Sequence, residues 1–300
     1  MDREQNIFRI IRGVGGNYWA HKPNLEEVQV QAPGVFRKKN NKPLAGDLTV
    51  CEATGDGLIP YRMTEILARK NSIPRPPIVN IDTLWLIIPL ANPEPDLWVL
   101  DKMLVIAHTM DVPVKIIFTK EDIAEDHMQT LADIYRSIPY EVVLSNPEKS
   151  DLILSLRDEI QGKFIALAGP SGAGKSTLLN LIFDADMMPT QEISEKLGRG
   201  KHTTRHVELF PLANGYLADT PGFSSLDLAQ AGVSEEQLVQ AYPEIWEKQN
   251  ACRYLSCKHL SEPECAIKSD PSINPGRLER YQEFRKQLEV IQDYERRPYR

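Results

Sequence analysis

Hydrophobic and polar positions alternate along the first 70 residues, in short runs separated by glycine-containing turns. The segments "EEVQVQAPGVF" and "GDLTVCEATGDGL" show this two-residue period. Such alternation predicts strands with one buried face, and closely spaced turn signals are typical of a small barrel or sandwich. A five-stranded barrel of the oligonucleotide-binding (OB) type has this size. We therefore predict an OB-type β-barrel for residues 1–72.

The pattern changes after "KNSIPRPPIVNID", which its prolines mark as a stiff linker. The apolar runs "LWLIIPL", "VKIIFT", "YEVVLS" and "KFIALAG" predict buried strands, and helical patterns occupy the segments between them. Strand–helix alternation predicts a mostly parallel sheet covered on both faces, which is an α/β fold. An Asn214-Gly215 turn between "HVELFPL" and "GYLAD" predicts a hairpin. This domain should span residues 73–232.

The last part of the chain is helical and contains cysteines. Ser234, with Gln237 three residues later, predicts a capping box at the start of a helix. The end of the chain, Arg277–Arg300, has the pattern of an amphipathic helix. We expect residues 233–300 to form a helical domain.

Composition and charge are those of an ordinary globular protein, with 42% hydrophobic residues, 26% charged residues and a net charge of −7. The acidic balance argues against indiscriminate binding to polyanions. The most apolar run, Leu84–Leu90, is too short to cross a membrane, and no signal peptide is visible. We expect a cytoplasmic protein with no membrane partner, acting as a monomer.

The stretch "GPSGAGKST" matches the phosphate-binding pattern GxxxxGK[ST]. It follows an apolar strand and precedes a helix, which is the context the pattern requires. Backbone N–H groups of such a loop surround phosphates, Lys175 supplies a charge to the terminal phosphates, and Ser176 offers a hydroxyl to Mg²⁺. We predict that the whole loop binds a nucleotide through nine residues: Gly169, Pro170, Ser171, Gly172, Ala173, Gly174, Lys175, Ser176 and Thr177.

Two downstream motifs supply parts of a hydrolytic site. "DTPG" follows a strand, so that Asp219 can hold Mg²⁺ through water and the Gly222 amide can reach a γ-phosphate. The polar segment "RGKHTTRH" lies between the loop and this motif. Within it Thr204, or else Thr203, is the candidate for a second hydroxyl on Mg²⁺ that orders when a triphosphate is bound.

The base-reading motif lies before the glycine loop. It is "TKED", comprising Thr119, Lys120, Glu121 and Asp122. A carboxylate at Asp122 can accept from both the ring N–H and the exocyclic amine of guanine, a donor pair that adenine lacks. The strand "YEVVLS" ends in Ser145 and Asn146, a second base-contacting position. This order of motifs predicts GTP and GDP as ligands of a circularly permuted GTPase, whose sequence begins in the middle of its sheet.

Three of the four cysteines crowd near the carboxyl end. "CRYLSCKHLSEPEC" places Cys252, Cys257, His259 and Cys265 at spacings that suit a tetrahedral metal site. Three thiolates and one imidazole are typical zinc ligands, and four protein ligands leave no open position for catalysis. We predict one structural Zn²⁺. The alternative is a set of buried cysteines beside an exposed histidine.

Taken together, "GDLTV", "RPPIVNID", "TKED", "GPSGAGKST", "RGKHTTRH", "DTPGF" and the four zinc ligands resemble the ribosome small-subunit-dependent GTPase A family (RsgA or YjeQ) over nearly the whole chain. The resemblance implies slow GTP hydrolysis that the small ribosomal subunit accelerates, and a role in late maturation of that subunit. It also implies contact with ribosomal RNA, for which the basic loop Arg37–Lys42 is a candidate.

The chain departs from the usual GTPase pattern at three positions. Thr119 stands where most GTPases have asparagine, and "LSNPEKSD" lacks the usual small residue and glycine after its serine. Phe223 follows "DTPG", where Ras-like GTPases place a water-orienting glutamine. A phenyl ring cannot orient water, so we expect slow hydrolysis in the free protein. His202 is the internal candidate for positioning the attacking water, and the alternative is an exposed loop histidine without this role. Lys175 and Thr204 are the other predicted catalytic groups.

Two other classes of function fit parts of the sequence. A metabolic P-loop ATPase or small-molecule kinase would prefer ATP and would not need Asp122. An RNA-binding scaffold with structural GTP would show no faster hydrolysis when small subunits are added. Nucleotide competition separates the first from a GTPase, and a hydrolysis assay separates the second.

Overall fold

The structure is a computed structural model that describes residues 6–34, 36, 42–55, 57, 59–184 and 207–295. The chain divides into two compact units, and each is assembled from segments far apart in sequence. The first comprises Met1–Trp85, Pro147–Ala168 and Gly174–Phe223. The second comprises Leu86–Asn146, Gly169–Ala173 and Ser224–Arg300.

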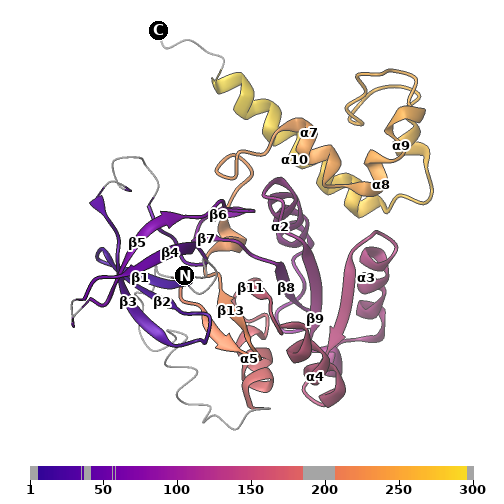
Figure 1. Ribbon diagram of the computed structural model, residues 1–300. Helices are drawn as coiled ribbons and strands as arrows, with labels where there is room; N and C mark the ends of the chain where they lie inside the picture. Colours follow the sequence, from indigo (N-terminus) through magenta and orange to yellow (C-terminus); the bar gives the residue numbers. More distant parts are fainter. Residues whose placement is uncertain are drawn as a thin grey trace. The chain divides into compact units, whose positions relative to one another are not determined.

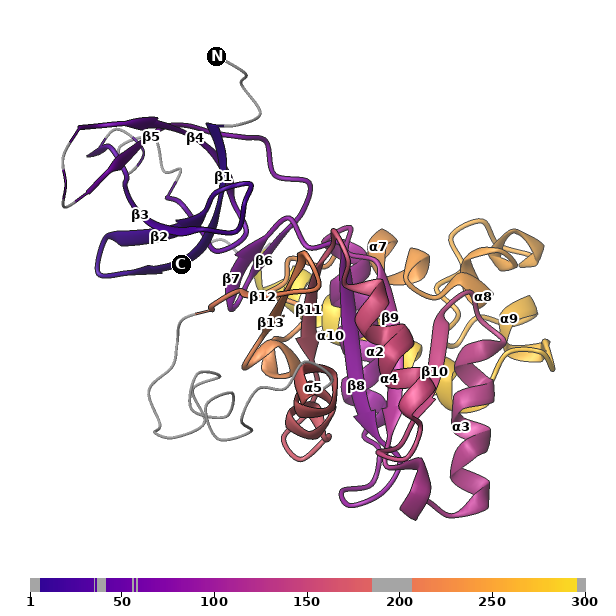
Figure 2. The same ribbon diagram turned by 60° about the horizontal axis from the view of Figure 1, so that its bottom comes forward.

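Five strands of the first unit close into a barrel, in the order β1-β2-β3-β5-β4 (Figure 2). Strand β3 pairs with β5 in parallel, and the remaining pairs are antiparallel. The strands are β1 (Ile7–Val14), β2 (Asn17–His21), β3 (Glu27–Gln31), β4 (Leu48–Ala53) and β5 (Tyr61–Ile66). The OB-type barrel predicted from the alternation is confirmed.

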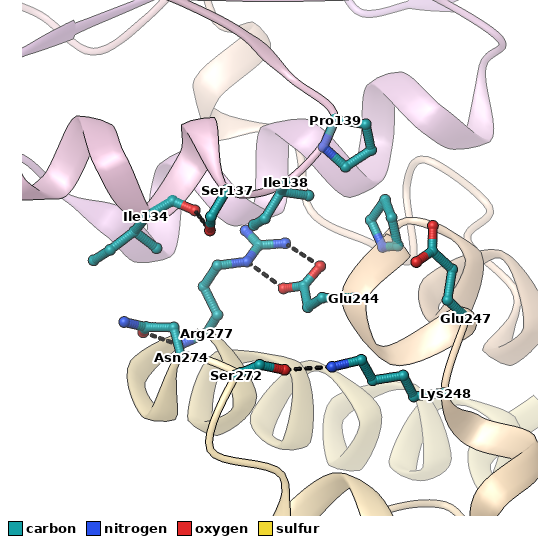
Figure 3. A pocket seen from close by; sticks show the side chains of 11 residues that line it. Ile134, Ser137, Ile138, Pro139, Glu244, Glu247, Lys248, Ser272, Asn274 and Arg277 are labelled. Carbon is teal, nitrogen blue, oxygen red and sulfur yellow. Dashed lines mark hydrogen bonds and ion pairs between the residues drawn. The ribbon is translucent and has the colours of Figure 1, made fainter.

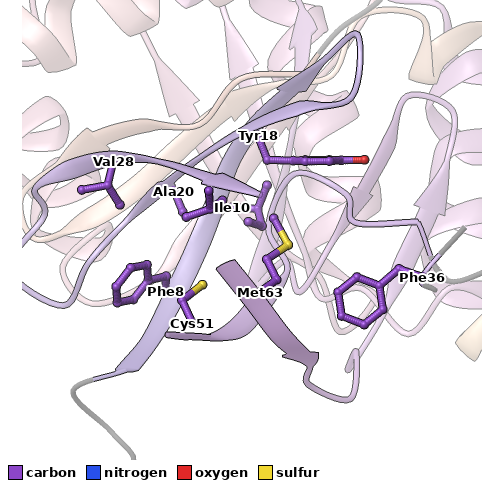
Figure 4. Close-up of a cluster of buried hydrophobic side chains, with 9 residues drawn as sticks. Phe8, Ile10, Tyr18, Ala20, Val28, Phe36, Cys51 and Met63 are labelled. Atoms are coloured by element: carbon purple, nitrogen blue, oxygen red, sulfur yellow. The ribbon is translucent and has the colours of Figure 1, made fainter. Parts of the chain in front are cut away.

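Alternate residues of the barrel strands fill its interior (Figure 4). Phe8 and Ile10 of β1 pack there with Tyr18 of β2, Cys51 of β4 and Met63 of β5. Because successive side chains of a strand point to opposite faces, the two-residue period places one set inside. The buried position of Cys51 leaves this thiol in the role of a small core residue.

The proline-rich segment after the barrel, predicted as a stiff linker, contains regular secondary structure. It forms an antiparallel pair of strands, β6 (Ser72–Pro74) and β7 (Pro77–Val79). Ile73 and Ile78 face each other in this pair and are fully buried. The prolines occupy the ends of the strands, where a missing N–H is tolerated, and the apolar residues between them provide the packing that the prolines concealed.

A six-stranded sheet follows, in the order β10-β9-β8-β11-β13-β12. Its first strand in the sequence, β8, is therefore an interior strand, which confirms that the chain enters the sheet in its middle. Both β10 with β9 and β11 with β13 are parallel pairs, whereas β12 and β13 form the predicted hairpin. The strands are β8 (Thr83–Pro89), β9 (Val114–Thr119), β10 (Glu141–Ser145), β11 (Phe164–Ala168), β12 (Phe210–Leu212) and β13 (Gly215–Asp219).

Helices connect these strands as the sequence predicted. They are α2 (Leu97–Thr109), α3 (Asp126–Arg136), α4 (Ser150–Glu159) and α5 (Lys175–Asp184). Helix α2 begins at the N-cap Asp96, whose side chain accepts from the Val99 amide at 3.0 Å. Its buried stripe includes Leu100, Met103 and Leu104, as expected of a helix that covers a sheet.

The carboxyl-terminal segment is helical (Figure 1). It contains α7 (Glu235–Gln240), α8 (Pro243–Trp246), α9 (Ala266–Ser269) and the long α10 (Pro275–Glu295). The predicted capping box is present: the Gln237 amide donates to Ser234 Oγ at 3.1 Å, and the Ser234 amide donates to the Gln237 side chain at 3.0 Å. Among the described residues, no helix combines the length and apolar character needed to cross a bilayer.

Candidate nucleotide and metal sites

The glycine loop runs from the end of β11 into the start of α5. Its three glycines, Gly169, Gly172 and Gly174, have φ angles of +156°, +77° and +84°. A Cβ atom on Gly169 would lie 2.2 Å from the carbonyl oxygen of Ile87, so no other residue fits there. Since α5 begins at Lys175, the glycine loop leads directly into the N-terminus of a helix. This is the geometry of an anion-binding loop at a helix N-terminus.

The segment after β8 also lies against the glycine loop, and no sequence motif predicted this contact. A Cβ on Gly172 would lie 3.3 Å from Pro93 Cδ, and the Lys120 ammonium donates to the carbonyl of Asn92. The glycine loop and the TKED motif thus contact the same loop, residues 90–96. Its proline-containing sequence, LANPEPD, matches no known ligand-binding pattern, so pattern reasoning had no means of finding it.

Thr119, the first residue of the TKED motif, ends β9 and is buried. Its hydroxyl donates to the Ala173 carbonyl at 2.6 Å, inside the glycine loop. A hydroxyl has one proton to donate. Thr119 therefore joins the base-motif strand directly to the glycine loop.

The two predicted base motifs lie side by side because of strand register. Ser145 of β10 is the pairing partner of Thr119 of β9. The Asn146 side chain donates to the Glu121 carboxylate at 3.1 Å, which links the loops that follow the two strands. Asp122 lies in a short 3₁₀ turn, Glu121–Ile123, and is exposed. An exposed carboxylate at this position is accessible to the edge of a ligand.

The DTPG motif follows β13, which pairs with β11 so that Asp219 lies opposite Leu167. Thr220 fixes this register, because its amide and its hydroxyl both donate to the Leu167 carbonyl, at 2.9 and 2.6 Å. Asp219 is thereby held beside the strand that leads into the glycine loop. Gly222 has a φ of +84°, and Phe223 is fully buried. The buried ring of Phe223 is not available to order water.

Several predicted residues lie outside the described residues. They are Arg37, Lys38, Lys39, His202, Thr203 and Thr204.

The cysteine and histidine cluster is assembled as predicted. The four ligand atoms of Cys252, Cys257, His259 and Cys265 all lie within 4.8 Å of one another. The distance from His259 Nδ1 to the Cys252 sulfur is 3.6 Å and to the Cys265 sulfur 3.4 Å, and these two sulfurs are 3.9 Å apart. The four cysteines of the chain are free thiols, and Cys51 lies in the barrel, away from this cluster.

These distances fit a tetrahedral ion. Metal–sulfur bonds of about 2.3 Å at a tetrahedral centre place two sulfurs about 3.8 Å apart. A disulfide would need about 2.05 Å. The donor set, three thiols and one imidazole nitrogen, is the one that zinc prefers in structural sites. The residues present therefore fit a metal ion held entirely by protein ligands.

Comparisons with known proteins agree with this geometry. A family model described as RsgA GTPase matches residues 66–229. The small ribosomal subunit biogenesis GTPase RsgA of Bacillus subtilis (strain 168) is 38% identical over 281 residues, covering 91% of this chain and 92% of that protein. A protein of the same name from Clostridium perfringens (strain SM101 / Type A) is 35% identical over 286 residues, covering 94% and 96%.

Two solved structures share the fold of nearly the whole chain. YloQ, described as a circularly permuted GTPase, matches with a TM-score of 0.77 and 31% identity, covering 98% of this chain and 96% of that one. YjeQ from Thermotoga maritima matches with a TM-score of 0.76 and 25% identity, covering 94% and 98%.

Proposed function

Since the chain belongs to the RsgA GTPase family, we propose that it hydrolyses GTP to GDP and phosphate on the small ribosomal subunit, in late maturation of that subunit. The observation that carries the proposal is the sheet order. The strand that ends in TKED, β9, and the strand that leads into the glycine loop, β11, flank β8 in one sheet although their motifs come in inverted order in the sequence, which supports a shared nucleotide site. Hydrolysis is slow in the free protein and faster on the subunit.

The nucleotide is held by the loop Gly169–Thr177 and read by Asp122, with Lys120 along the base. The link between Asn146 and Glu121 supports a shared base pocket of the two motifs. Because Thr119 Oγ1 donates to Ala173, we assign it to shaping this pocket alongside any contact with guanine.

Mg²⁺ would be held by the hydroxyls of Ser176 and Thr204 and, through water, by Asp219. The ion would supply charge stabilisation to the phosphates. In this proposal the Gly222 amide and the Lys175 ammonium stabilise the negative charge that develops on the phosphate oxygens during hydrolysis. Phe223 is buried, so His202 is the internal group we assign to positioning water.

We assign Zn²⁺ to the cluster around His259, where it stabilises the carboxyl-terminal segment. The domain boundaries that we propose are residues 1–72 for the barrel, 73–232 for the GTPase domain and 233–300 for the zinc-bearing helical domain. The barrel and its loop Arg37–Lys42 contact ribosomal RNA. We propose that the protein acts as a monomer in the cytoplasm.

The test is GTP hydrolysis by the full chain with and without purified small ribosomal subunits. We expect a slow rate alone and a clear increase with subunits, and a much smaller increase for His202→Ala. An unchanged rate on adding subunits would favour the scaffold function, and stronger competition by ATP than by GDP would favour a metabolic ATPase. A near wild-type stimulated rate for His202→Ala would remove this residue from the mechanism.

A further inference from the structure

A group of buried charges joins the carboxyl-terminal helix α10 to α2 and α3. The side chain of Asp101 in α2 is fully buried, and those of Arg277 and Arg280 in α10 are 1% and 7% exposed. Arg277 Nη1 donates to Asp101 Oδ1 at 2.6 Å, and Arg280 Nε donates to Oδ2. Tyr135 of α3 adds a third donor, with its hydroxyl 2.8 Å from Asp101 Oδ1. One carboxylate of α2 thus accepts hydrogen bonds from α3 and α10.

Arg277 extends the group to α8. Its Nε donates to Glu244 Oε1 at 2.5 Å, on the wall of a cavity of about 250 Å³ (Figure 3). Its guanidinium also lies 4.5 Å from the ring centre of Tyr242 and 5.3 Å from that of Tyr135. We call Asp101, Tyr135, Glu244, Arg277 and Arg280 the Asp101 cluster.

The Asp101 cluster contains two carboxylates and two guanidinium groups, so its formal charges cancel. Removing one partner of a buried ion pair leaves an uncompensated charge in a low-dielectric interior, which is strongly destabilising. Burial, and then the nearby carboxylate of Asp101, raise the pKa of Tyr135, so its hydroxyl remains a donor. Helices α2, α3, α8 and α10 cannot separate without exposing these groups.

Further contacts join the same elements. The Trp98 and Phe284 rings of α2 and α10 meet edge to face at 5.9 Å. The Tyr140 hydroxyl, just before β10, donates to the Ala241 carbonyl at 3.2 Å. The division of the chain agrees, because Leu86–Asn146 and Ser224–Arg300 belong to one compact unit.

The attachment points lie on the helix that follows the first base motif and just before the strand that ends in the second. Helix α3 begins at Asp126, shortly after TKED, and Tyr135 lies in its last turn. Tyr140 precedes β10, whose last residue is Ser145. The carboxyl-terminal helices therefore hold the ends of α3 and β10 that lie opposite to the base motifs. An 11-residue helix is stiff, so fixing one end restrains the direction of the other.

We propose that Arg277 and Arg280 are positioning residues for the guanine pocket: through the Asp101 cluster, α10 holds α3 and with it the base motif. The carboxyl-terminal segment, α3 and the base motif that precedes α3 then move as one body. A displacement of the carboxyl-terminal segment would therefore also displace Asp122. The positioning of Asp122 on a guanine rests on the proposed function, whereas the mechanical coupling of α10 to α3 does not.

The mechanical part is tested by hydrogen exchange of the full chain, followed by mass spectrometry. Arg280→Met in α10 should speed exchange in α3, and Tyr135→Phe in α3 should speed exchange in α10, each by about tenfold, the effect of one lost hydrogen bond to a charged group. Lys248→Gln is the matched control, because Lys248 pairs with Asp270 inside the carboxyl-terminal segment. Exchange in α3 that stays at the parent rate in Arg280→Met, or exchange in α10 that stays so in Tyr135→Phe, overturns the coupling.

The positioning part is tested by affinity for GDP and for inosine diphosphate, which lacks the exocyclic amine. The parent should prefer GDP, and Arg280→Met should reduce this preference toward equality, with Arg280→Lys retaining most of it. A preference unchanged in Arg280→Met, together with faster exchange in α3, overturns the positioning role alone. A parent chain that binds neither diphosphate overturns the proposed function, and the exchange experiment still decides the coupling.

Discussion

The hydroxyl of Thr119 was expected to contact the ligand, but it donates a hydrogen bond within the protein. Its place in TKED predicted a contact with guanine. In the structure the residue is buried and donates to Ala173, a fully buried residue of the glycine loop. The fold around Thr119 thus gives its hydroxyl a structural partner that a motif comparison cannot reveal, because the motif says nothing of the carbonyl that faces it.

Replacing Thr119 by valine keeps the shape of the side chain and removes the donor. The Ala173 carbonyl then loses its bond, which should cost about 1–3 kcal/mol of unfolding free energy. Nucleotide affinity should fall as the glycine loop loosens. Urea unfolding and titration with fluorescent GDP measure both effects, and Thr119→Ser, which restores the hydroxyl, is the control. Equal behaviour of the valine and serine variants would show that the hydrogen bond contributes nothing.

His21 is a buried imidazole between the barrel and the β12–β13 hairpin. Its Nδ1 lies 3.3 Å from the Tyr216 hydroxyl. Burial lowers the pKa of His21, Glu27 opposes this effect, and Arg12 adds to it. The unfolded chain, with an ordinary histidine pKa near 6.5, therefore takes up the proton first as the pH falls.

Neutral His21 makes its full contribution to the free energy of unfolding above the ordinary histidine pKa. This contribution is lost as the pH falls below that value, because protonation then favours the unfolded chain. We expect the unfolding free energy to decrease between about pH 7 and pH 5, and to decrease less in His21→Gln. Urea unfolding at a series of pH values measures the difference. Identical pH dependence in the two proteins would contradict this assignment.

Secondary structure elements were predictable where a local pattern determines them. The barrel strands follow from alternation, β8 and β11 from apolar runs, and α7 from its capping box. The pair β6–β7 was missed because its prolines suggested a linker, whereas packing of Ile73 and Ile78 defines it. Packing partners far away in the chain leave no local trace in the sequence.

The site shows the same division between local and distant information. The glycine loop, the base motif and the metal ligands have fixed spacings that reflect their chemistry, and the structure assembles the described ones. Asp101 and Arg277 were not singled out, because a charged residue in a helix is usually solvated. Only their encounter across 176 positions makes them a buried pair.

The metal cluster should determine the stability of the segment Cys252–Cys265. This segment lies between the 3₁₀ turn Gln249–Ala251 and α9 and contains no helix or strand, so it has few backbone hydrogen bonds of its own. Removing the ion with a chelator should lower the melting temperature by several degrees, as loss of a structural metal does. Metal analysis should find one zinc per chain, absent in Cys265→Ser and retained in Cys51→Ala. A melting temperature insensitive to the chelator would contradict a structural ion.

At the scale of the whole molecule, the chain path links Gly222, for which we propose a γ-phosphate contact, to the carboxyl-terminal segment. The last segment of the first compact unit ends at Phe223, immediately after Gly222. The chain then continues from Ser224 to α7. Under the proposed function, loss of the γ-phosphate would release the Gly222 amide, and switch segments reorganise when such a contact is lost.

The nucleotide should therefore change the affinity for the small subunit. We expect the complex with a non-hydrolysable GTP analogue to bind small subunits about tenfold more tightly than the GDP complex, a coupling of the usual size. Sedimentation of subunits with the protein under the two conditions measures the ratio. Equal affinities of the two complexes would show that the proposed γ-phosphate contact does not influence binding to the small subunit.

The interior position of β8 has a consequence for the order of events during synthesis. The ribosome delivers this strand before either of its neighbours, and the run Leu84–Leu90 then has two open edges. The nearer neighbour, β9, follows soon, whereas β11 begins only at Phe164. Until then one edge of an apolar strand stays open to wrong partners. The permuted order of the strands thus leaves one edge of β8 exposed in the nascent chain until β11 is made. In an unpermuted order β11 would precede β8 and could pair with it at once.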